Sequence, residues 1–418
     1  MTDLTSSTVR GLDAFRGLCA DLDDIHARVG APVSTRSLWL IPWAETHPEY
    51  EPVCVVIRSP ERIEAAAVLA IRRVMGCDMV VAAAHTLSDR IWLAACDDAS
   101  ARALADAIAA FLESLTRPWF LDIRQLPVDD PVAAHLARLL PTSELRVGVP
   151  LPQTHFIDGK PIEEYMGKNY RRSVRKSERK LSGDHEWSYV WLRDPVEIER
   201  LLPEIEAIRQ ARDHDVGRFS DLDRGGGEFW RRLVRSAAGT VEVSTVTVDG
   251  RLGAYCVCLR DGDVMVAWDG RPAPEYLPYW TGNLVLTQVL ITSHADPSIR
   301  SVDWCRGESF YKQRLANGVD QTQDLRAWSS PTARRTYELL AATRAKLAAY
   351  KNRTSGLHHL WLSLRKRLDR LSASRRGLTA PGDTRHGDAA GVPDRRRASG
   401  ESPERGIPGK QLEPEDTE

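Results

Sequence analysis

The stretch VEVSTVTVDGRLGAYCVCLRDGDVMVAWD (241–269) decides the fold. It holds three apolar runs, at 241–248, 252–259 and 264–269, which are separated by the turn sequences Asp249-Gly250 and Asp261-Gly262-Asp263. An Asp-Gly pair between two apolar runs is among the strongest local signals for a tight hairpin turn. The stretch therefore predicts a three-stranded antiparallel meander.

The segments on either side of this meander complete an α/β unit. Before it, alternation over 185–193 predicts a strand, and 195–212 and 228–237 predict two helices. After it, 281–294 is an apolar helical stretch, 301–304 a short strand and 309–316 another helix. The expected order is strand, two helices, three meander strands, helix, strand, helix.

This order resembles that of the GNAT acyltransferase fold. The segments NYRRSVRKSERKL (169–181) and DWCRGESFYKQRLANG (303–318) resemble landmarks of the GNAT-like family that includes the CelD-type cellulose-biosynthesis proteins. More distantly they resemble the Fem-type aminoacyl transferases of peptidoglycan synthesis. The resemblance covers about residues 11–330. It implies an α/β (α+β) fold with two tandem GNAT-like domains, each a mixed, largely antiparallel sheet flanked by helices.

The first half is compatible with a second copy of this fold. Apolar periodicity predicts a helix over 12–29 that Gly30 closes, strands at 52–57, 80–84, 90–96 and 119–124, and helices at 99–115 and 131–140. Alanines over 64–74 favour a helix, whereas the resemblance implies a strand, which we adopt. The expected domains are 1–150 and 151–330, followed by basic helices at 331–371 and a disordered tail at 372–418.

The net charge of −1 hides an asymmetry along the chain. Residues 1–150 hold 14 Arg, no Lys and 20 acidic residues, whereas 351–418 hold 14 basic and 10 acidic residues. Any attraction to nucleic acid must therefore be local, and we expect no DNA partner. The basic segment 357–371 is compatible with peripheral membrane contact, although packing on the domain is favoured.

The sequence also indicates a cytoplasmic protein. The start lacks a basic region followed by an apolar stretch, and no apolar run approaches the roughly 20 residues that span a bilayer. Seven cysteines, spread singly, do not suggest a disulfide framework. Cys256 and Cys258 have no further ligands at a suitable spacing, so we expect no metal site.

The family resemblance implies acyl-CoA as co-substrate, with its pyrophosphate at the start of the helix that follows the meander. The corresponding sequence is RPAPEYLPYWTGN (271–283), which lacks the usual [Arg/Gln]-x-x-Gly-x-[Gly/Ala] pattern. Unpaired N–H groups at a helix start suit phosphate. The candidates are Arg271, Thr281, Gly282 and Asn283, and the alternative is a Pro-rich loop with a threonine cap.

Acyl transfer to an amine needs a base, an oxyanion partner and an acid for the leaving group. Asp269 or Glu308 is the candidate base, Tyr311 the acid, and Lys312 the partner of the oxyanion or of a phosphate. The alternative makes Glu308 a helix-cap or salt-bridge residue and Lys312 an ordinary surface charge. Asp303 and His214 are candidates for contacts to the substrate in the cleft. For Asp303 the alternative is again a helix-cap or salt-bridge residue.

The basic helix expected at 168–180 carries seven positive residues against Glu178. Its candidate contacts, Arg171, Arg172 and Arg175, suggest a nearby anion: a phosphate-bearing substrate, a tRNA acceptor end, or the acidic first half. A solvated basic face is the alternative.

The leading hypothesis is a GNAT-type N-acyltransferase that moves an acyl group from acyl-CoA to an amine or hydroxyl of a polar saccharide or cell-envelope acceptor. A Fem-like transferase that uses aminoacyl-tRNA is the second hypothesis. A non-catalytic GNAT-like scaffold in polysaccharide biosynthesis is the third.

Overall fold

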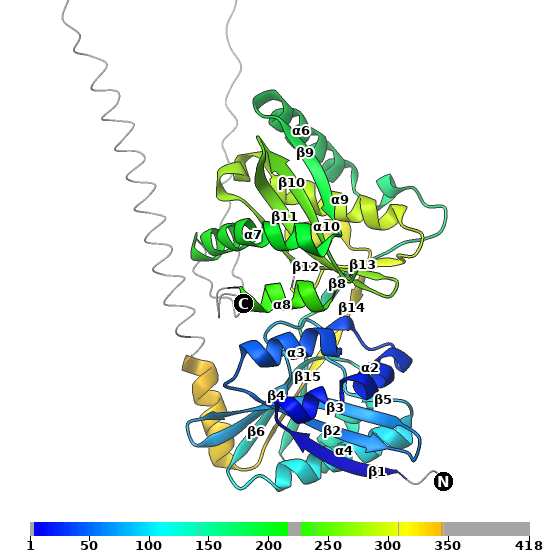
Figure 1. The fold of residues 1–418 in the computed structure, drawn as a ribbon, viewed down its shortest axis with the longest axis vertical. Coiled ribbons are helices and arrows are strands. Elements are labelled where there is room, and N and C mark those ends of the chain that lie inside the picture. Colours follow the sequence, from blue (N-terminus) through cyan, green and yellow to red (C-terminus); the bar gives the residue numbers. More distant parts are fainter. Residues whose placement is uncertain are drawn as a thin grey trace, which may run out of the picture. The chain divides into compact units, whose positions relative to one another are not determined.

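The computed structural model describes residues 4–140, 142–215, 227–237, 239–307, 309–343 and 346. They belong to one compact unit of the chain and form two mixed sheets flanked by helices, so the protein is of the α/β class (Figure 1). The expected helices beyond residue 346, the segment 357–371 and the tail 372–418 lie outside the described residues.

The second sheet grows from the predicted meander. β10, β11 and β12 pair antiparallel, β9 extends the sheet beyond β10, and β13 lies parallel to β12. β8 and β14 complete it, in the order β14-β8-β13-β12-β11-β10-β9. The strands are β8 (Leu151–His155), β9 (Trp187–Leu192), β10 (Val241–Val248), β11 (Arg251–Asp261), β12 (Val264–Pro272), β13 (Ser301–Asp303) and β14 (Gly318–Asp320).

Helices cover this sheet in the predicted order. The most apolar of them, α9, packs on β10, β11 and β12 and buries Leu284, Val285, Val289 and Leu290. The helices are η2 (Ile162–Tyr165), α6 (Lys168–Asp184), α7 (Pro195–Asp215), α8 (Glu228–Ser236), η4 (Pro274–Tyr279), α9 (Thr281–Ala295) and α10 (Phe310–Leu315).

The first sheet has the order β1-β2-β3-β4-β6-β15-β7, with β5 pairing β3. The segment 64–74 is a strand, as adopted above. Its alanines fit because both faces of β3 are covered: Ala66 and Ala70 belong to one core, and Ala65 and Ala67 to the other. The strands are β1 (Thr5–Arg10), β2 (Glu51–Arg58), β3 (Ile63–Val74), β4 (Cys77–Ala82), β5 (Ala94–Ala95), β6 (Trp119–Pro127), β7 (Ser143–Val147) and β15 (Thr322–Trp328).

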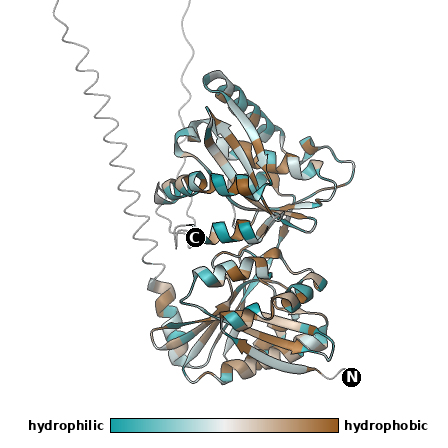
Figure 2. Ribbon diagram, viewed as in Figure 1, coloured by the Kyte–Doolittle hydropathy of each residue, from teal (hydrophilic) through white to brown (hydrophobic). Residues whose placement is uncertain are grey.

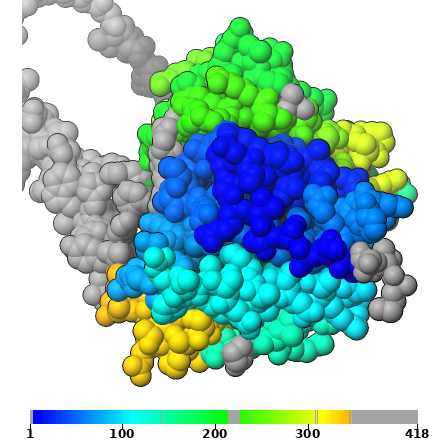
Figure 3. All heavy atoms as spheres, turned by 60° about the horizontal axis from the view of Figure 1, so that its bottom comes forward, coloured from blue at the N-terminus to red at the C-terminus, as the bar shows by residue number. Residues whose placement is uncertain are grey.

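The helices of the first half depart from the prediction in two places. The helix expected over 12–29 is broken at Gly17 and Leu18, and the apolar helix over 37–46 has no counterpart in the prediction. In Figure 3 the N-terminal residues, in blue, lie beside the cyan surface of the same half, and α4 contacts β1. The helices are α1 (Leu12–Arg16), α2 (Cys19–Arg28), η1 (Val33–Thr35), α3 (Ser37–Thr46), α4 (Asp98–Glu113) and α5 (Pro131–Leu139).

The strand β15 corrects the expected domain limits at one point. Residues 322–328 were assigned to the C-terminal domain, yet β15 pairs with β6 and β7 and lies inside the first sheet. The reason is burial, since Leu325 and Ala327 are fully buried in the core of the first half. The helix that follows β15 also packs on the first half, because the ring centroid of Tyr337 lies 5.5 Å from that of Phe120.

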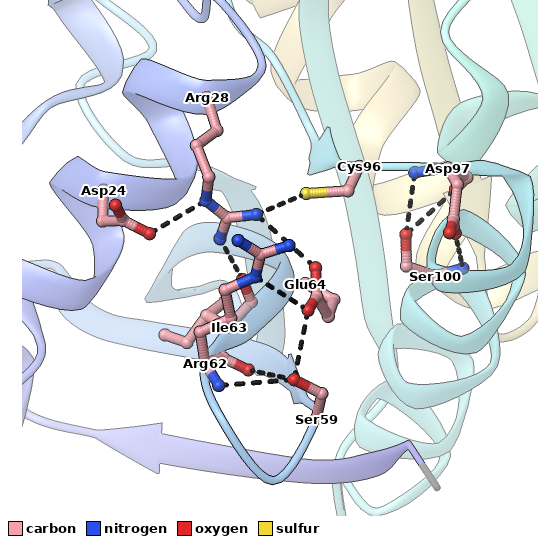
Figure 4. A network of polar contacts seen from close by, with 9 residues as sticks. All are labelled: Asp24, Arg28, Ser59, Arg62, Ile63, Glu64, Cys96, Asp97 and Ser100. Carbon is pink, nitrogen blue, oxygen red and sulfur yellow. Dashed lines mark hydrogen bonds and ion pairs between the residues drawn. The ribbon is translucent and has the colours of Figure 1, made fainter. Parts of the chain in front are cut away.

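A network on α2 shows how strand and helix are joined in the first half (Figure 4). Arg28 donates to Asp24 on its own helix, to the Ile63 carbonyl oxygen and to the Cys96 sulfur.

Figure 2 shows brown, hydrophobic residues along the strands and teal, hydrophilic ones on α6, α7 and α8. Among the residues that the structure describes, no helix has both the length and the apolarity to cross a bilayer.

Candidate functional site

Two neighbouring strands separate at the centre of the second sheet. β12 pairs with β13 only through Val264, Met265 and Val266, whereas β11 accompanies it as far as Pro272. The register between β11 and β12 shifts next to Trp268, which has no opposite residue. The far part of β12, residues 267–272, therefore has one edge without a strand partner in the described sheet.

A pocket of about 330 Å³ lies at this open end, and we call it the donor pocket. It brings Arg271, the first turn of α9 and Tyr311 together. The sequence analysis predicted these groups, from separate stretches of the chain, as parts of one site. Its lining residues are Gly270, Arg271, Pro272, Leu277, Trp280, Thr281, Gly282, Asn283, Val285, Leu286 and Tyr311.

The start of α9 has free backbone donors. The N–H groups of Asn283 and Leu284 donate to the Trp280 carbonyl oxygen, whereas those of Thr281 and Gly282 have no acceptor among the described residues. The Thr281 hydroxyl donates to the Gly253 carbonyl oxygen, so it does not form the threonine cap of the alternative interpretation. These free donors suit an anion.

Gly282 allows α9 to approach β12 closely. A Cβ at this position would lie 3.3 Å from the Pro272 ring. Trp280, directly before the helix, adopts the left-handed conformation with φ 57° and is 46% exposed at the pocket. A tryptophan in this conformation is unusual, and such backbone strain concentrates at functional sites.

The basic helix α6 borders the donor pocket. Its Tyr170 hydroxyl donates to the Asn283 carbonyl oxygen at 3.3 Å, and Lys180 Nζ donates to that of Pro278 at 3.2 Å. Tyr170, Val174, Ser177 and Leu181 form the buried side of the helix. The remaining basic residues form no ion pair within the described ranges; they are Lys168, Arg171, Arg172, Arg175, Lys176 and Arg179.

Asp269 is engaged in a buried polar cluster instead of facing solvent as a free carboxylate. It accepts a hydrogen bond from the Tyr255 hydroxyl at 2.8 Å and pairs with Arg271 at 3.1 Å. Arg271 lies 3.5 Å from Asp213 as well. Burial raises the pKa of Tyr255 well above its ordinary value, so its hydroxyl stays a donor.

The two neighbours Tyr311 and Lys312 have different surroundings. Tyr311 lines the donor pocket, and burial raises the pKa of its hydroxyl, which keeps it protonated at neutral pH. Lys312 does not line that pocket. Its Nζ donates to the carbonyl oxygens of Cys305 at 3.1 Å and Arg306 at 2.5 Å, and burial lowers its pKa. Its expected role toward the oxyanion stays a prediction.

The other predicted site residues lie elsewhere. Asp303, which is 2% exposed, accepts hydrogen bonds from Arg90 at 2.6 Å and from the Cys305 N–H at 2.7 Å, and it lines a different pocket. His214 belongs to the last turn of α7, but its side chain is outside the described part, as is all of Glu308.

The sequence did not single out Tyr255, Pro272 or Trp280, which complete the site. Tyr255 lies opposite Arg271 in the antiparallel register of β11 and β12. The sequence signal that could have revealed it is a polar residue on the central strand of the meander. Trp280 had no signal, because a left-handed tryptophan before a helix follows no sequence rule.

Comparisons with known proteins concern the fold that holds this site. Residues 168–313 match the family model described as an acetyltransferase (GNAT) domain. The crystal structure of FemX is similar over 76% of this chain and 97% of that chain, with a TM-score of 0.55 and 10% identity. A tandem GNAT protein from the clavulanic acid biosynthesis pathway is similar over 79% and 99%, with a TM-score of 0.45 and 14% identity.

No curated protein sequence matches the chain. The second half carries a GNAT-fold acetyltransferase domain, and about three quarters of the chain share the fold of FemX. The narrower resemblance to CelD-type proteins stays a prediction.

Proposed function

We propose that this protein is a GNAT-type N-acyltransferase that moves an acyl group from acyl-CoA to an amine or hydroxyl of a polar saccharide or cell-envelope acceptor in the cytoplasm. The observation that carries the proposal is the unpartnered edge of β12, which leads directly to the free N–H groups at the start of α9. An extended pantetheine chain pairs naturally with such an edge, and a pyrophosphate with such a helix start.

The transfer to an amine requires one bond to form and one to break. The lone pair of the neutral amine attacks the thioester carbonyl carbon, the C–N bond forms, and the C–S bond breaks. The departing sulfur takes one proton, for which the hydroxyl of Tyr311 at the donor pocket is the proposed donor, and the nitrogen loses one proton to solvent or a base. The products are an amide and free CoA.

The donor site would consist of backbone and side-chain groups already close together. The phosphate groups would lie at the start of α9, where the N–H groups of Thr281 and Gly282 and the side chain of Asn283 line the pocket. The guanidinium of Arg271 would bind them as well. Asp269 orients Arg271 through its ion pair. We therefore assign Asp269 a positioning role and keep Lys312 and Glu308 as candidates for the oxyanion partner and the base.

Calorimetric titration with acetyl-CoA tests the donor site. Gly282→Asp adds a negative charge at the start of α9, and we expect at least a tenfold loss of affinity. Gly282→Ala is the matched control, since both variants place a Cβ against Pro272 but only one adds charge. Binding that both variants leave unchanged would exclude this site, and equal losses in both would assign the effect to crowding.

Transfer from aminoacyl-tRNA is the second candidate, because α6 contacts the start of α9 through Tyr170 and carries exposed cations that form no ion pair among the described residues. Acetyl-CoA and tRNA would then compete at one site. A protein that binds neither would fit the scaffold hypothesis.

A further inference from the structure

The strand β7 (Ser143–Val147) forms one edge of the first sheet. Its inner side pairs antiparallel with β15, and its outer side has no strand partner among the described residues. Just past the strand, the Gly148 N–H donates to the Thr322 carbonyl oxygen of β15, and the backbone groups of every second residue before it share this direction. The residues between them, whose N–H and C=O groups point outward, are Ser143, Leu145 and Val147.

The surroundings of β7 are exposed and apolar. Five of the fourteen large hydrophobic residues that are exposed in the described part of the chain lie within 128–149, so apolar surface concentrates around α5 and β7. They are Val128, Leu139, Leu145, Val147 and Val149, and Val147 is 84% exposed. An unpaired, apolar strand edge is a template for a further strand.

The charges of β7 restrict which strand fits. On the inner side, Glu144 lies opposite Arg326 of β15, and Arg146 lies opposite Asp324. Antiparallel pairing thus aligns Glu-Leu-Arg on β7 with Asp-Leu-Arg on β15, with opposite charges across from each other. Such pairs favour the alignment of two strands, whereas like charges oppose it. Glu144 and Arg146 also pair with each other at 2.8 Å, and 54% of the Arg146 side chain remains exposed.

A second copy of β7 offers the same pattern to the outer edge. Two antiparallel β7 strands centred on Leu145 would place Glu144 of each copy opposite Arg146 of the other. The outward backbone groups of Leu145 would then meet those of its counterpart, and the groups of Ser143 would meet those of Val147. A strand with another order of charges would set like charges against each other, so the pattern favours the chain's own copy.

We propose that two copies of this protein pair antiparallel through β7 and form a dimer with two-fold symmetry, in which the two first sheets join into one continuous sheet. The same strand serves both copies, as two-fold symmetry requires. No residue of β7 lines the donor pocket, so the dimer does not depend on the proposed function.

Sedimentation equilibrium of the full chain tests the dimer. We expect the mean mass of wild-type protein to rise with concentration from the 46.7 kDa of one chain toward twice that value. Glu144→Arg and Arg146→Glu each set like charges against each other across the two-fold axis. Each should raise the dissociation constant of the dimer at least tenfold, while circular dichroism shows a folded protein.

An equimolar mixture of these two variants is the decisive sample. The two arginines of one variant then lie opposite the two glutamates of the other, so we expect the dimer to return in the mixture. Damage to β7 or to its pairing with β15 would persist in the mixture, because both remain within a single chain. The return of the dimer therefore separates pairing between copies from a fault in the fold.

Leu145→Lys tests the same edge without changing the charges opposite β15. Two lysines would meet at the two-fold axis, and the dissociation constant should again rise at least tenfold. Val319→Lys is the matched control and should leave the dimer unchanged, because Val319 is an exposed residue on β14, an edge strand of the second sheet.

Three results would each overturn the proposal. The first is wild-type protein that stays at the mass of one chain up to about 0.1 mM. The second is a mixture of folded Glu144→Arg and Arg146→Glu proteins that stays monomeric. The third is a dimer that Val319→Lys dissociates and Leu145→Lys does not.

Discussion

At the scale of single residues, Lys312 has surroundings that its sequence context does not reveal. The Tyr-Lys pair after a short strand predicted a functional lysine, and the neighbouring Tyr311 does line the donor pocket. The ammonium of Lys312 instead donates to two carbonyl groups of the turn at 305–306. Side-chain identity is visible in a sequence, but the backbone groups that it contacts depend on the path of the chain.

Lys312→Met should therefore destabilise the fold. It leaves the Cys305 and Arg306 carbonyl groups without their donor, and we expect a loss of about 1–3 kcal/mol in the free energy of unfolding, measured in urea. Lys176→Met, on the exposed side of α6, is the control and should change little. A Lys312→Met protein of wild-type stability that no longer transfers acyl groups would instead place the lysine in the chemistry.

His26 should make stability depend on pH. It is 1% exposed on α2, and burial lowers its pKa from 6.5 to about 4. Between these two values the unfolded chain binds a proton that the folded protein excludes, so stability is full above pH 6.5 and falls toward pH 4. The difference corresponds to roughly 3 kcal/mol. Urea unfolding at pH 7 and pH 5 should show a smaller loss for His26→Leu than for wild type, and equal losses would refute this account.

At the scale of elements, the second half was largely predictable, because its meander has Asp-Gly turns and its helices have clear periodicity. β9 to β13 and α7 to α10 all lie within a few residues of their predicted positions. The first half was harder to predict. β5 is only Ala94–Ala95 of the expected strand, and the apolar helix α3 carries no polar stripe that would reveal it, since Trp39, Leu40 and Trp43 are all buried.

Binding of tRNA tests α6 as an element. Contacts to single-stranded phosphates release counterions, so the logarithm of affinity should fall with the logarithm of salt by about 0.7 per contact. Replacing Arg172, Arg175, Lys176 and Arg179 by Gln removes four exposed cations without touching the buried side of the helix, and should flatten that slope by about 3.

The control for this experiment replaces four exposed arginines of the first half, namely Arg10, Arg62, Arg102 and Arg146. A tRNA affinity that neither salt nor the α6 changes affect would reject the aminoacyl-tRNA hypothesis. No tRNA binding at all would leave acyl-CoA as the donor.

At the scale of the whole molecule, Arg90 links the two halves. It extends from the first half to Asp303 on β13 and Asp320 on β14, and Asp303 is 2% exposed. Nothing in the sequence near position 90 indicates a partner more than 200 residues away. The sequence predicted two similar halves from local patterns, whereas their junction depends on such distant pairs.

Arg90→Met should weaken the whole fold. It leaves the buried Asp303 carboxylate without its cation, and removal of one partner of a buried ion pair costs about 3–5 kcal/mol. Arg10→Met is the control, because the Arg10–Glu51 pair is nearly half exposed and worth at most about 1 kcal/mol. Thermal unfolding followed by circular dichroism compares the two. A melting temperature for Arg90→Met within a degree of that for Arg10→Met would show that the junction does not depend on this pair.

The position of β15 has a consequence for how the chain is made. A ribosome releases residues in order, and β6 and β7 emerge nearly two hundred residues before the strand that belongs between them. During that interval the edge of β6 and the core around Ile123 lack the cover of β15, and we expect this exposed edge to make the nascent first half prone to aggregation. In the second half β8 likewise precedes its partners β13 and β14, but the meander β10 to β12 pairs with sequence neighbours and is free to form as soon as it is made.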